Sequence, residues 1–396
     1  MSSKSTFCAL PWLQLSCKTN GAVRTCGYAR VTSGGQANLG RDEVSTSWNS
    51  DYFKLIRKTM LAGQEPPNCT KCYYRESHGG TSRRQKENDA WSKDFSEDLA
   101  RKLTKEDGSI DIPPVSLDIR TGNVCNLKCV TCFPTNSTKW LEDTELLGKY
   151  ENTQNYKVVP AWDQADGPAW KFVKEHGPSL KKISFLGGEP LASPLHQSIL
   201  ESLISQSAYQ VALKYVTNGT LLSPQILGKW ARFDSVQIMV SIDGIGPILE
   251  FIRFPAKWAK LELNLKLLND FVARNVKREV LWTCSNLSLY YLPETLEYFG
   301  SHFPGLEFVL GDYVTKPAHM SAQNLPPICK ELILDKFRDK GTLGKYPQAE
   351  FYLNNMMEEN LWPSMGSTLI QYLDDLDRAR KTNWRDSFKE LSPYLK

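Results

Sequence analysis

The ten cysteines are the residues of this sequence whose type and spacing could do chemistry. They are Cys8, Cys17, Cys26, Cys69, Cys72, Cys125, Cys129, Cys132, Cys284 and Cys329. A chain of 396 residues can bury a large core without disulfide staples, and its first residues show no credible secretory signal. Clustered thiols in a reducing compartment usually bind metals or do redox chemistry. We therefore predict a cytoplasmic protein whose cysteines hold metal centres.

Composition and charge exclude several other classes of protein. Hydrophobic residues make up 41% of the chain, which excludes a wholly disordered protein. No stretch has the roughly 18 uncharged apolar residues that a membrane span needs. The net charge of +4 does not predict an electrostatic grip on a long nucleic acid. We therefore expect neither a membrane nor a long nucleic acid as a partner.

The order of the expected elements after residue 112 indicates an α/β fold. Strands are predicted at residues 115–120, 182–185, 211–216, 235–242, 280–284 and 306–314. Apolar residues at helical spacing fall between them, at 195–205, 224–232 and 261–273. Strands that alternate with helices predict a parallel sheet, open or closed into a barrel, with its chemistry at the carboxyl ends of the strands.

Three regions are expected along the chain. Residues 1–112 are predicted to hold short strands and turns, with one helix at 51–62 and a solvated basic helix face at 82–86. Residues 113–345 carry the alternating strands and helices. Residues 346–396 form a helical extension, whose last amphipathic helix is expected to pack on the sheet domain without a catalytic role.

Cys125, Cys129 and Cys132 directly follow the first strand of the alternating region, with the spacing C-x3-C-x2-C. A structural zinc site normally has four protein ligands, and no fourth cysteine or histidine lies nearby in the sequence. Three thiolates and a free position suit a [4Fe-4S] cluster with one iron open to another ligand. An unrelated cluster or a zinc site is the alternative.

Polar motifs follow the next three strands. Gly187-Gly188-Glu189-Pro190 combines two glycines, which let the backbone approach a ligand closely, with a carboxylate that can offset an amine. Thr217-Asn218-Gly219-Thr220 and Ser241-Ile242-Asp243-Gly244 end the following two strands. Polar tips on apolar strands are typical of a ligand-facing rim, although each motif alone is also a common turn.

In their order and spacing these motifs resemble the radical S-adenosylmethionine (SAM) superfamily. The resemblance implies a (β/α)6 partial TIM barrel in which the open iron of the first cluster chelates the amino and carboxylate groups of SAM. An electron from the cluster then cleaves SAM to a 5′-deoxyadenosyl radical, which abstracts hydrogen from a substrate.

The resemblance also assigns SAM contacts. It places the methionine ammonium on Gly187, Gly188 and Glu189. It predicts that the ribose and carboxylate of SAM are bound by Thr217, Asn218, Ser241, Asp243 and Arg253. Asn286 is a weaker candidate near the adenosine. One departure is Thr131, which stands where many members have an aromatic residue near the adenine, so no adenine-stacking residue is assigned.

Cys8, Cys26, Cys69 and Cys72 form a second set. The stretch from residue 7 to residue 26 has the pattern of a hairpin with thiols at its ends, and Cys69 and Cys72 form C-x2-C. This arrangement resembles the twitch half of SPASM domains, here placed before the barrel. The resemblance implies a closed auxiliary [4Fe-4S] cluster that relays an electron or tunes its surroundings, and a zinc ribbon is the alternative.

Three cysteines remain. Cys17 is expected to be a small buried residue, although it could substitute as a ligand, and Cys329 is expected to be structural. Cys284 lies near the carboxyl end of the fifth strand. It is either a packed core residue or a hydrogen-atom donor of the kind found in radical SAM epimerases.

The sequence thus predicts a radical SAM oxidoreductase or maturase that acts on a peptide or a small metabolite. The reaction that we expect first is a two-electron oxidation assisted by the auxiliary cluster, with a reductant such as flavodoxin or ferredoxin. Redox-neutral epimerisation or rearrangement comes second. A non-catalytic iron–sulfur or zinc binding module is the alternative from a different class.

Overall fold

The strands of the chain form a mostly parallel sheet. The computed structural model describes residues 5–31, 37–77, 80–150 and 162–396. Within them the strand order is β2-β1-β3-β4-β5-β6-β7-β8. The strands are β1 (Gln14–Cys17), β2 (Val23–Arg24), β3 (Ser116–Arg120), β4 (Lys182–Leu186), β5 (Ala212–Thr217), β6 (Val236–Ser241), β7 (Val276–Cys284) and β8 (Glu307–Tyr313). The predicted α/β class is confirmed, and β3 to β8 overlap the six predicted strands.

Contacts divide the chain into two compact units. The first unit comprises Met1–Val124, Val158–Tyr215 and Arg232–Val236. The second comprises Cys125–Lys157, Val216–Ala231 and Gln237–Lys396.

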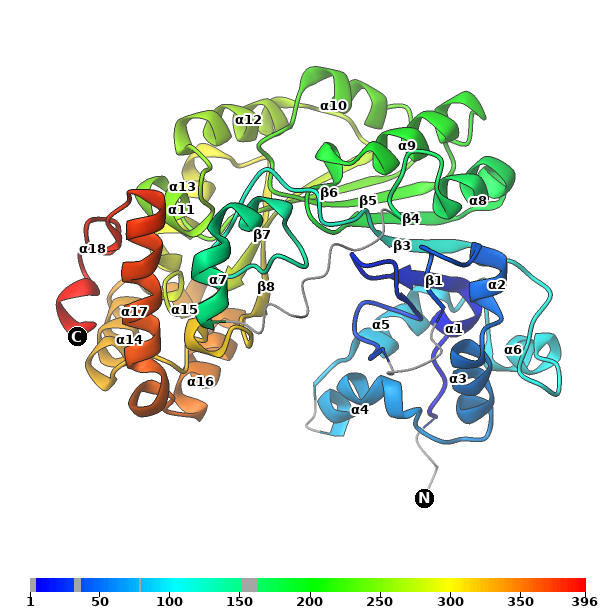
Figure 1. Ribbon diagram of the computed structural model, residues 1–396, viewed down its shortest axis with the longest axis horizontal. Helices are drawn as coiled ribbons and strands as arrows, with labels where there is room; N and C mark the ends of the chain where they lie inside the picture. The colour runs from blue at the N-terminus through cyan, green and yellow to red at the C-terminus, as the bar shows by residue number, and fades with distance from the viewer. Residues whose placement is uncertain (1–4, 32–36, 78–79, 151–161) are drawn as a thin grey trace. The chain divides into compact units, whose positions relative to one another are not determined.

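The first 112 residues are mainly helical, which corrects the expectation of short strands. Their helices are α1 (Leu10–Leu13), α2 (Val44–Trp48), α3 (Asp51–Leu61), α4 (Thr70–Ser77), α5 (Arg83–Trp91) and α6 (Glu97–Leu103). The predicted helix at 51–62 is confirmed as α3, which buries Phe53, Ile56 and Met60 at helical spacing. Helix α1 packs against β1, α3 and α5, as Figure 1 shows in blue to cyan.

The predicted hairpin between residues 7 and 26 exists in part. Strands β1 and β2 pair antiparallel, with Ser16 opposite Arg24. The residues before β1 are helical, however, because Pro11 occupies the first turn of α1, where its missing N–H costs nothing. Strand β1 also pairs parallel with β3 along its whole length, which local sequence patterns did not indicate.

The second unit packs helices and strands around one apolar cluster. Strands β7 and β8 are parallel neighbours. The last amphipathic helix is confirmed as α17 (Trp362–Arg380), which buries Leu369, Leu373 and Leu376. Helix α17 contacts α18 (Trp384–Ser387) and α7 (Thr144–Tyr150), as can be followed in Figure 1. Within the described ranges, no helix combines the length and the apolar character needed to cross a membrane.

His319 gives the second unit a measurable pH dependence. Its ring is buried beside the rings of Tyr150 and Tyr372, and burial lowers its pKa to about 4. The unfolded chain therefore binds the proton more readily, so stability is full above about pH 6.5 and falls as the pH drops toward 4.

We expect denaturant unfolding to show this loss. Between about pH 7.5 and about pH 5.5, wild type should lose about 1 kcal/mol more than His319→Gln, which has no titrating ring. Equal losses in the two proteins would contradict the assignment.

Candidate functional site

The three cysteines of the first predicted cluster lie together on one loop of the second unit, residues 125–132. Burial raises the pKa of the Cys129 thiol, the cation of Arg253 opposes that shift, and Cys132 and Cys125 add to it. These mutual effects require the three thiols and the guanidinium to be close neighbours. The predicted grouping of three thiols on one loop is thus present beside a fixed positive charge.

The backbone of this loop runs along residues 252–254. The N–H of Lys128 donates to the carbonyl of Phe254 at 2.7 Å, and the N–H of Val130 donates to that of Ile252 at 2.8 Å. Alternate backbone groups of the loop are therefore paired, as at the edge of a sheet. This pairing fixes the chain on both sides of Arg253 against the cysteine loop.

Side chains from elsewhere hold the carbonyls of the loop. Three of them donate hydrogen bonds: Ser137 to Leu127 at 2.5 Å, Trp140 to Cys129 at 3.1 Å and Tyr372 to Val130 at 2.8 Å. Tyr372 lies on α17, so that helix does more than pack against its neighbours. Sequence reasoning missed this role because it joins residues that are far apart in the chain.

A buried charge network anchors the same loop. Nζ of Lys128 lies 2.5 Å from Asp143, and Nε of Arg380, also on α17, lies 3.1 Å from the other oxygen of Asp143. All three side chains are buried. Buried charges persist only when they are paired, so this network fixes the loop in one position.

Asp243 and Arg253, both predicted SAM contacts, form a buried ion pair. Nη2 of Arg253 lies 2.8 Å from Oδ2 of Asp243, whose Oδ1 accepts a hydrogen bond from the N–H of Thr283 at 3.3 Å. Among the described residues, Nε of Arg253 has no hydrogen-bond partner. A buried N–H beside an ion pair is suited to donate a hydrogen bond to an anionic ligand atom.

The loop after β5 is bonded to the cysteine loop. Asn218 donates to Oδ1 of Asn126 at 2.9 Å and lies 4.0 Å from the sulfur of Cys125. Asn126 in turn donates to the hydroxyl of Thr220 at 2.8 Å. Thr217 accepts from the N–H of Gly219. The predicted tip of this strand therefore has a structural role in holding the cysteine loop.

Two further predicted contacts lie in the second unit. Ser241 ends β6 and is half-buried. Asn286 is fully buried and donates to the carbonyl of His319 at 2.8 Å. Its side-chain oxygen has no partner among the described residues.

The Gly-Gly-Glu turn lies in the first unit and packs against the segment that leads into Cys125. The N–H of Gly188 donates to the carbonyl of Gly122 at 3.0 Å, and that of Glu189 to the carbonyl of Val124 at 2.8 Å. A side chain on Gly188 would place its Cβ 2.2 Å from the Val124 carbonyl oxygen. The glycine is therefore required by a close approach of two backbones.

Gly187 and Glu189 complete this turn. Gly187 has φ +120°, a conformation that other residues rarely adopt. Glu189 is fully buried, and its Oε1 accepts from the N–H of Leu191 at 3.1 Å. The turn holds a buried carboxylate at the carboxyl end of β4.

The four cysteines of the second set line one cavity of the first unit. Cys8 precedes α1, Cys26 follows β2, Cys69 ends η1 (Pro67–Cys69), and Cys72 lies on α4. Burial raises the pKa of Cys69 to about 12, and Cys26 and Cys72 add to the shift. Cys17 is buried in β1 and is not among the described residues that line this cavity.

Both cysteine sets have the donor chemistry of an iron–sulfur cluster, whose irons are held by thiolates. Within the described residues, no three or more His, Cys, Asp or Glu side chains are grouped so as to hold a metal ion. A four-iron cluster is wider than one ion, so its ligands need not be grouped as closely as those of a single ion.

Residues 119–302 match the family described as the Radical SAM superfamily. This part of the chain, a little under half of its length, is similar to a radical SAM domain. It includes the three-cysteine loop, the Gly-Gly-Glu turn, and the ends of β5 and β6.

Two solved structures with bound S-adenosylmethionine are distantly similar to the chain. Native anSMEcpe with bound AdoMet is 21% identical with a TM-score of 0.38, over 57% of this chain and 60% of that one. SuiB of Streptococcus suis bound to S-adenosylmethionine is 17% identical with a TM-score of 0.39, over 71% of this chain and 63% of that one. The chain thus spans less than two thirds of either structure, and no curated protein matches it significantly.

Cys284 is not among the polar residues described above, although it lies within the matched range. It is fully buried in the apolar cluster of the second unit, which also contains Trp282 and Tyr352. Burial raises the pKa of its thiol. Its role as a hydrogen-atom donor stays a prediction.

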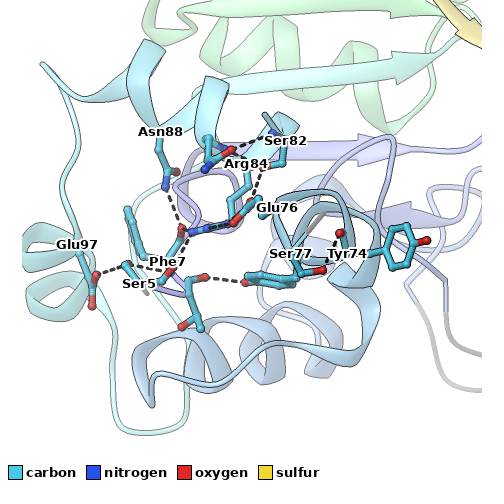
Figure 2. A network of polar contacts seen from close by, with 12 residues as sticks. Ser5, Phe7, Tyr74, Glu76, Ser77, Ser82, Arg84, Asn88 and Glu97 are labelled. Carbon is cyan, nitrogen blue, oxygen red and sulfur yellow. Dashed lines mark hydrogen bonds and ion pairs between the residues drawn. The ribbon is translucent and has the colours of Figure 1, made fainter. Parts of the chain in front are cut away.

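A polar network positions the second set of cysteines. Figure 2 shows Arg84 of α5 between Glu76 of α4 and the backbone of Phe7. The guanidinium donates to the Phe7 carbonyl at 2.6 Å and to Glu76 at 3.0 Å, and Asn88 donates to the same carbonyl at 2.9 Å. The network therefore links the residue before Cys8 to the helix that carries Cys72.

This network corrects the expectation of a solvated helix face at residues 82–86. Ser82 and Arg84 are buried, whereas Gln85 and Lys86 are exposed. The helix turns one cation inward because Glu76 is there to pair with it.

Arg84→Gln should destabilise the first unit by about 3 kcal/mol, because it leaves the Glu76 carboxylate buried without its partner. Denaturant unfolding measures the effect. The matched control Lys86→Gln removes an exposed cation from the same helix and should change stability by less than about 0.5 kcal/mol. Similar small effects of both changes would show that the network holds nothing in place.

Proposed function

We propose that this chain is a radical SAM enzyme that abstracts a hydrogen atom from a substrate carbon. The observation that carries the proposal is the fixed loop of Cys125, Cys129 and Cys132 beside the ion pair of Arg253 and Asp243. Three thiolates leave one iron of a [4Fe-4S] cluster open. When bound and reduced, that cluster supplies the electron that cleaves SAM to the hydrogen-abstracting 5′-deoxyadenosyl radical.

In this proposal, the residues that the resemblance assigns to SAM bind and orient it. Arg253 pairs with the SAM carboxylate through its Nε, which has no partner among the described residues, while Asp243 holds its guanidinium in place. The buried carboxylate of Glu189, with Gly187 and Gly188, takes the SAM ammonium. The ribose falls to the strand-end residues Thr217, Asn218 and Ser241.

Cys8, Cys26, Cys69 and Cys72 hold an auxiliary [4Fe-4S] cluster in the proposal. Their shared cavity supports one four-thiolate site, and the Arg84 network supports a fixed spacing of its ligands. Four thiolates close the cluster to substrate, so its part is to pass or accept an electron. A zinc ion on the same four thiolates is the alternative.

The reaction that we propose is a two-electron oxidation of a peptide or small metabolite. Cys8, Cys26, Cys69 and Cys72 would hold the auxiliary cluster, which would supply an acceptor for the second electron of that oxidation. A flavodoxin or ferredoxin reduces the first cluster, and the cytoplasm is the compartment that suits both clusters. The ranges 1–112, 113–345 and 346–396 stay our proposed twitch-like domain, partial barrel and helical extension.

Two matched cysteine variants test both clusters. Anaerobically reconstituted wild type should carry roughly eight irons per chain, and Cys132→Ala and Cys72→Ala should each carry roughly four. With SAM and a strong reductant, Cys132→Ala should form no 5′-deoxyadenosine, because the open iron is lost. Cys72→Ala should still form it.

Other outcomes discriminate the alternatives. If wild type contained zinc in place of four of the irons, the second set of cysteines would be a zinc ribbon and not an auxiliary cluster. Absence of 5′-deoxyadenosine from fully loaded, reduced wild type would favour the non-catalytic module.

Cys284→Ala tests the epimerase alternative. We expect both clusters, SAM cleavage and turnover to persist, because Cys284 lies in an apolar cluster, and stability to fall by about 1 kcal/mol. Iron content, 5′-deoxyadenosine and product are measured on the same sample. Loss of product with SAM cleavage intact would instead support the hydrogen donor.

A further inference from the structure

One face of the sheet in the first unit is polar and positively charged. Ser16 of β1 lies opposite both Arg24 of β2 and Asp118 of β3. Side chains alternate between the faces of a strand, so Arg120, two residues after Asp118, shares this face, and Lys18 follows β1 on the same side. The opposite face is apolar, with Leu15, Leu117, Ile119, Ile183 and Phe185 all buried.

Positive charge exceeds negative charge on this face. A Cβ on Gly27 would lie 3.1 Å from Nη1 of Arg83, 3.9 Å from Oδ2 of Asp118 and 4.0 Å from Nη2 of Arg24. Asp118 already forms an ion pair with Arg83 at 3.5 Å. Glu87 pairs with the same arginine at 3.3 Å, so both nearby carboxylates share Arg83, and Arg24 is left without an ion pair of its own among the described residues.

Several polar groups of this face lack partners among the described residues. Arg24 is only 5% exposed, yet among the described residues its Nε and Nη2 have no hydrogen-bond acceptor. The same holds for Nε of Arg120 and for the buried hydroxyl of Ser16. Leaving a buried charge unpaired is costly, and the guanidinium fork fits a carboxylate or phosphate.

Lys18 lies within electrostatic reach of both arginines. Burial lowers the pKa of Lys18, and repulsion from Arg24 and then Arg120 lowers it further. A bound anion would relieve this repulsion among the three cations.

The cations lie at the same edge of the sheet as the Gly-Gly-Glu turn. Arg120 is the last residue of β3, and Gly187 follows β4, its strand neighbour. A Cβ on Gly187 would lie 3.0 Å from the carbonyl carbon of Arg120. Ligands of parallel α/β folds bind at this carboxyl edge.

We propose that Arg24 and Arg120, with Lys18 and Ser16, bind an anionic group of the substrate, either a carboxylate or a phosphate. That the ligand is the substrate of a SAM-derived radical rests on the proposed function. That the site binds an anion does not rest on it.

The competing explanation is that these cations only balance the charge of the auxiliary cluster. Arg24 stands two residues before Cys26 in the sequence. The two explanations differ in whether an added anion binds and in what the loss of Arg24 changes.

Calorimetric titration of the anaerobically reconstituted full chain with inorganic phosphate, and separately with acetate, tests the proposal. Wild type should bind one anion per chain, and Arg24→Gln and the half-buried Arg120→Gln should each weaken binding at least tenfold. Arg24→Lys should restore part of the affinity, because it keeps the charge but loses the fork. Arg41→Gln, which removes an exposed cation of the same unit, should bind as wild type does.

The anion that wild type binds more tightly identifies the class of ligand: phosphate indicates a phosphate group and acetate a carboxylate. Failure of both to bind wild type, or unchanged binding by Arg24→Gln and Arg120→Gln, would overturn the site. Lowered iron content in Arg24→Gln, without anion binding by wild type, would assign the cations to the cluster instead. Anion binding by a wild type that forms no 5′-deoxyadenosine would keep the anion site and remove the proposed radical function.

Discussion

The parallel register of β3 against β4 is the constraint on which the first unit depends. Arg120 pairs with Leu186, so the two strands end at one level and their following loops begin side by side. One loop leads to Cys125, and the other is the Gly-Gly-Glu turn, which donates two backbone hydrogen bonds to it. A slip of one residue would turn Asp118 and Arg120 to the apolar face, which the buried core forbids.

Buried charge is the second common element of the account. The loop of three cysteines is anchored by Lys128, Asp143 and Arg380, and Cys8 is positioned through Arg84 and Glu76. In both places each charge meets an opposite one, which makes burial tolerable. Within the described residues Arg24 and Arg120 form no ion pair, although Asp118 attracts Arg24, and their unpartnered nitrogens support the binding site that we propose on this face.

Patterns within short windows predicted much of the fold. Alternation of apolar strands and amphipathic helices located β3 to β8, α3 and α17, and the cysteine spacings grouped the seven thiols into two sets. Apolar periodicity did not indicate the helices of the first 112 residues, which are short and are held by contacts such as Arg84 with Phe7. The pairing of β1 with β3 and the bond from Tyr372 to Val130 depend on long-range register, which no local pattern contains.

The central claim is an iron left open by Cys125, Cys129 and Cys132 to bind SAM. Electron paramagnetic resonance of the anaerobically reconstituted and reduced protein, with and without SAM, tests it most directly. The account predicts that SAM changes the signal of one cluster, in wild type and in Cys72→Ala alike. A signal that SAM leaves unchanged in a fully loaded, reduced sample would contradict it.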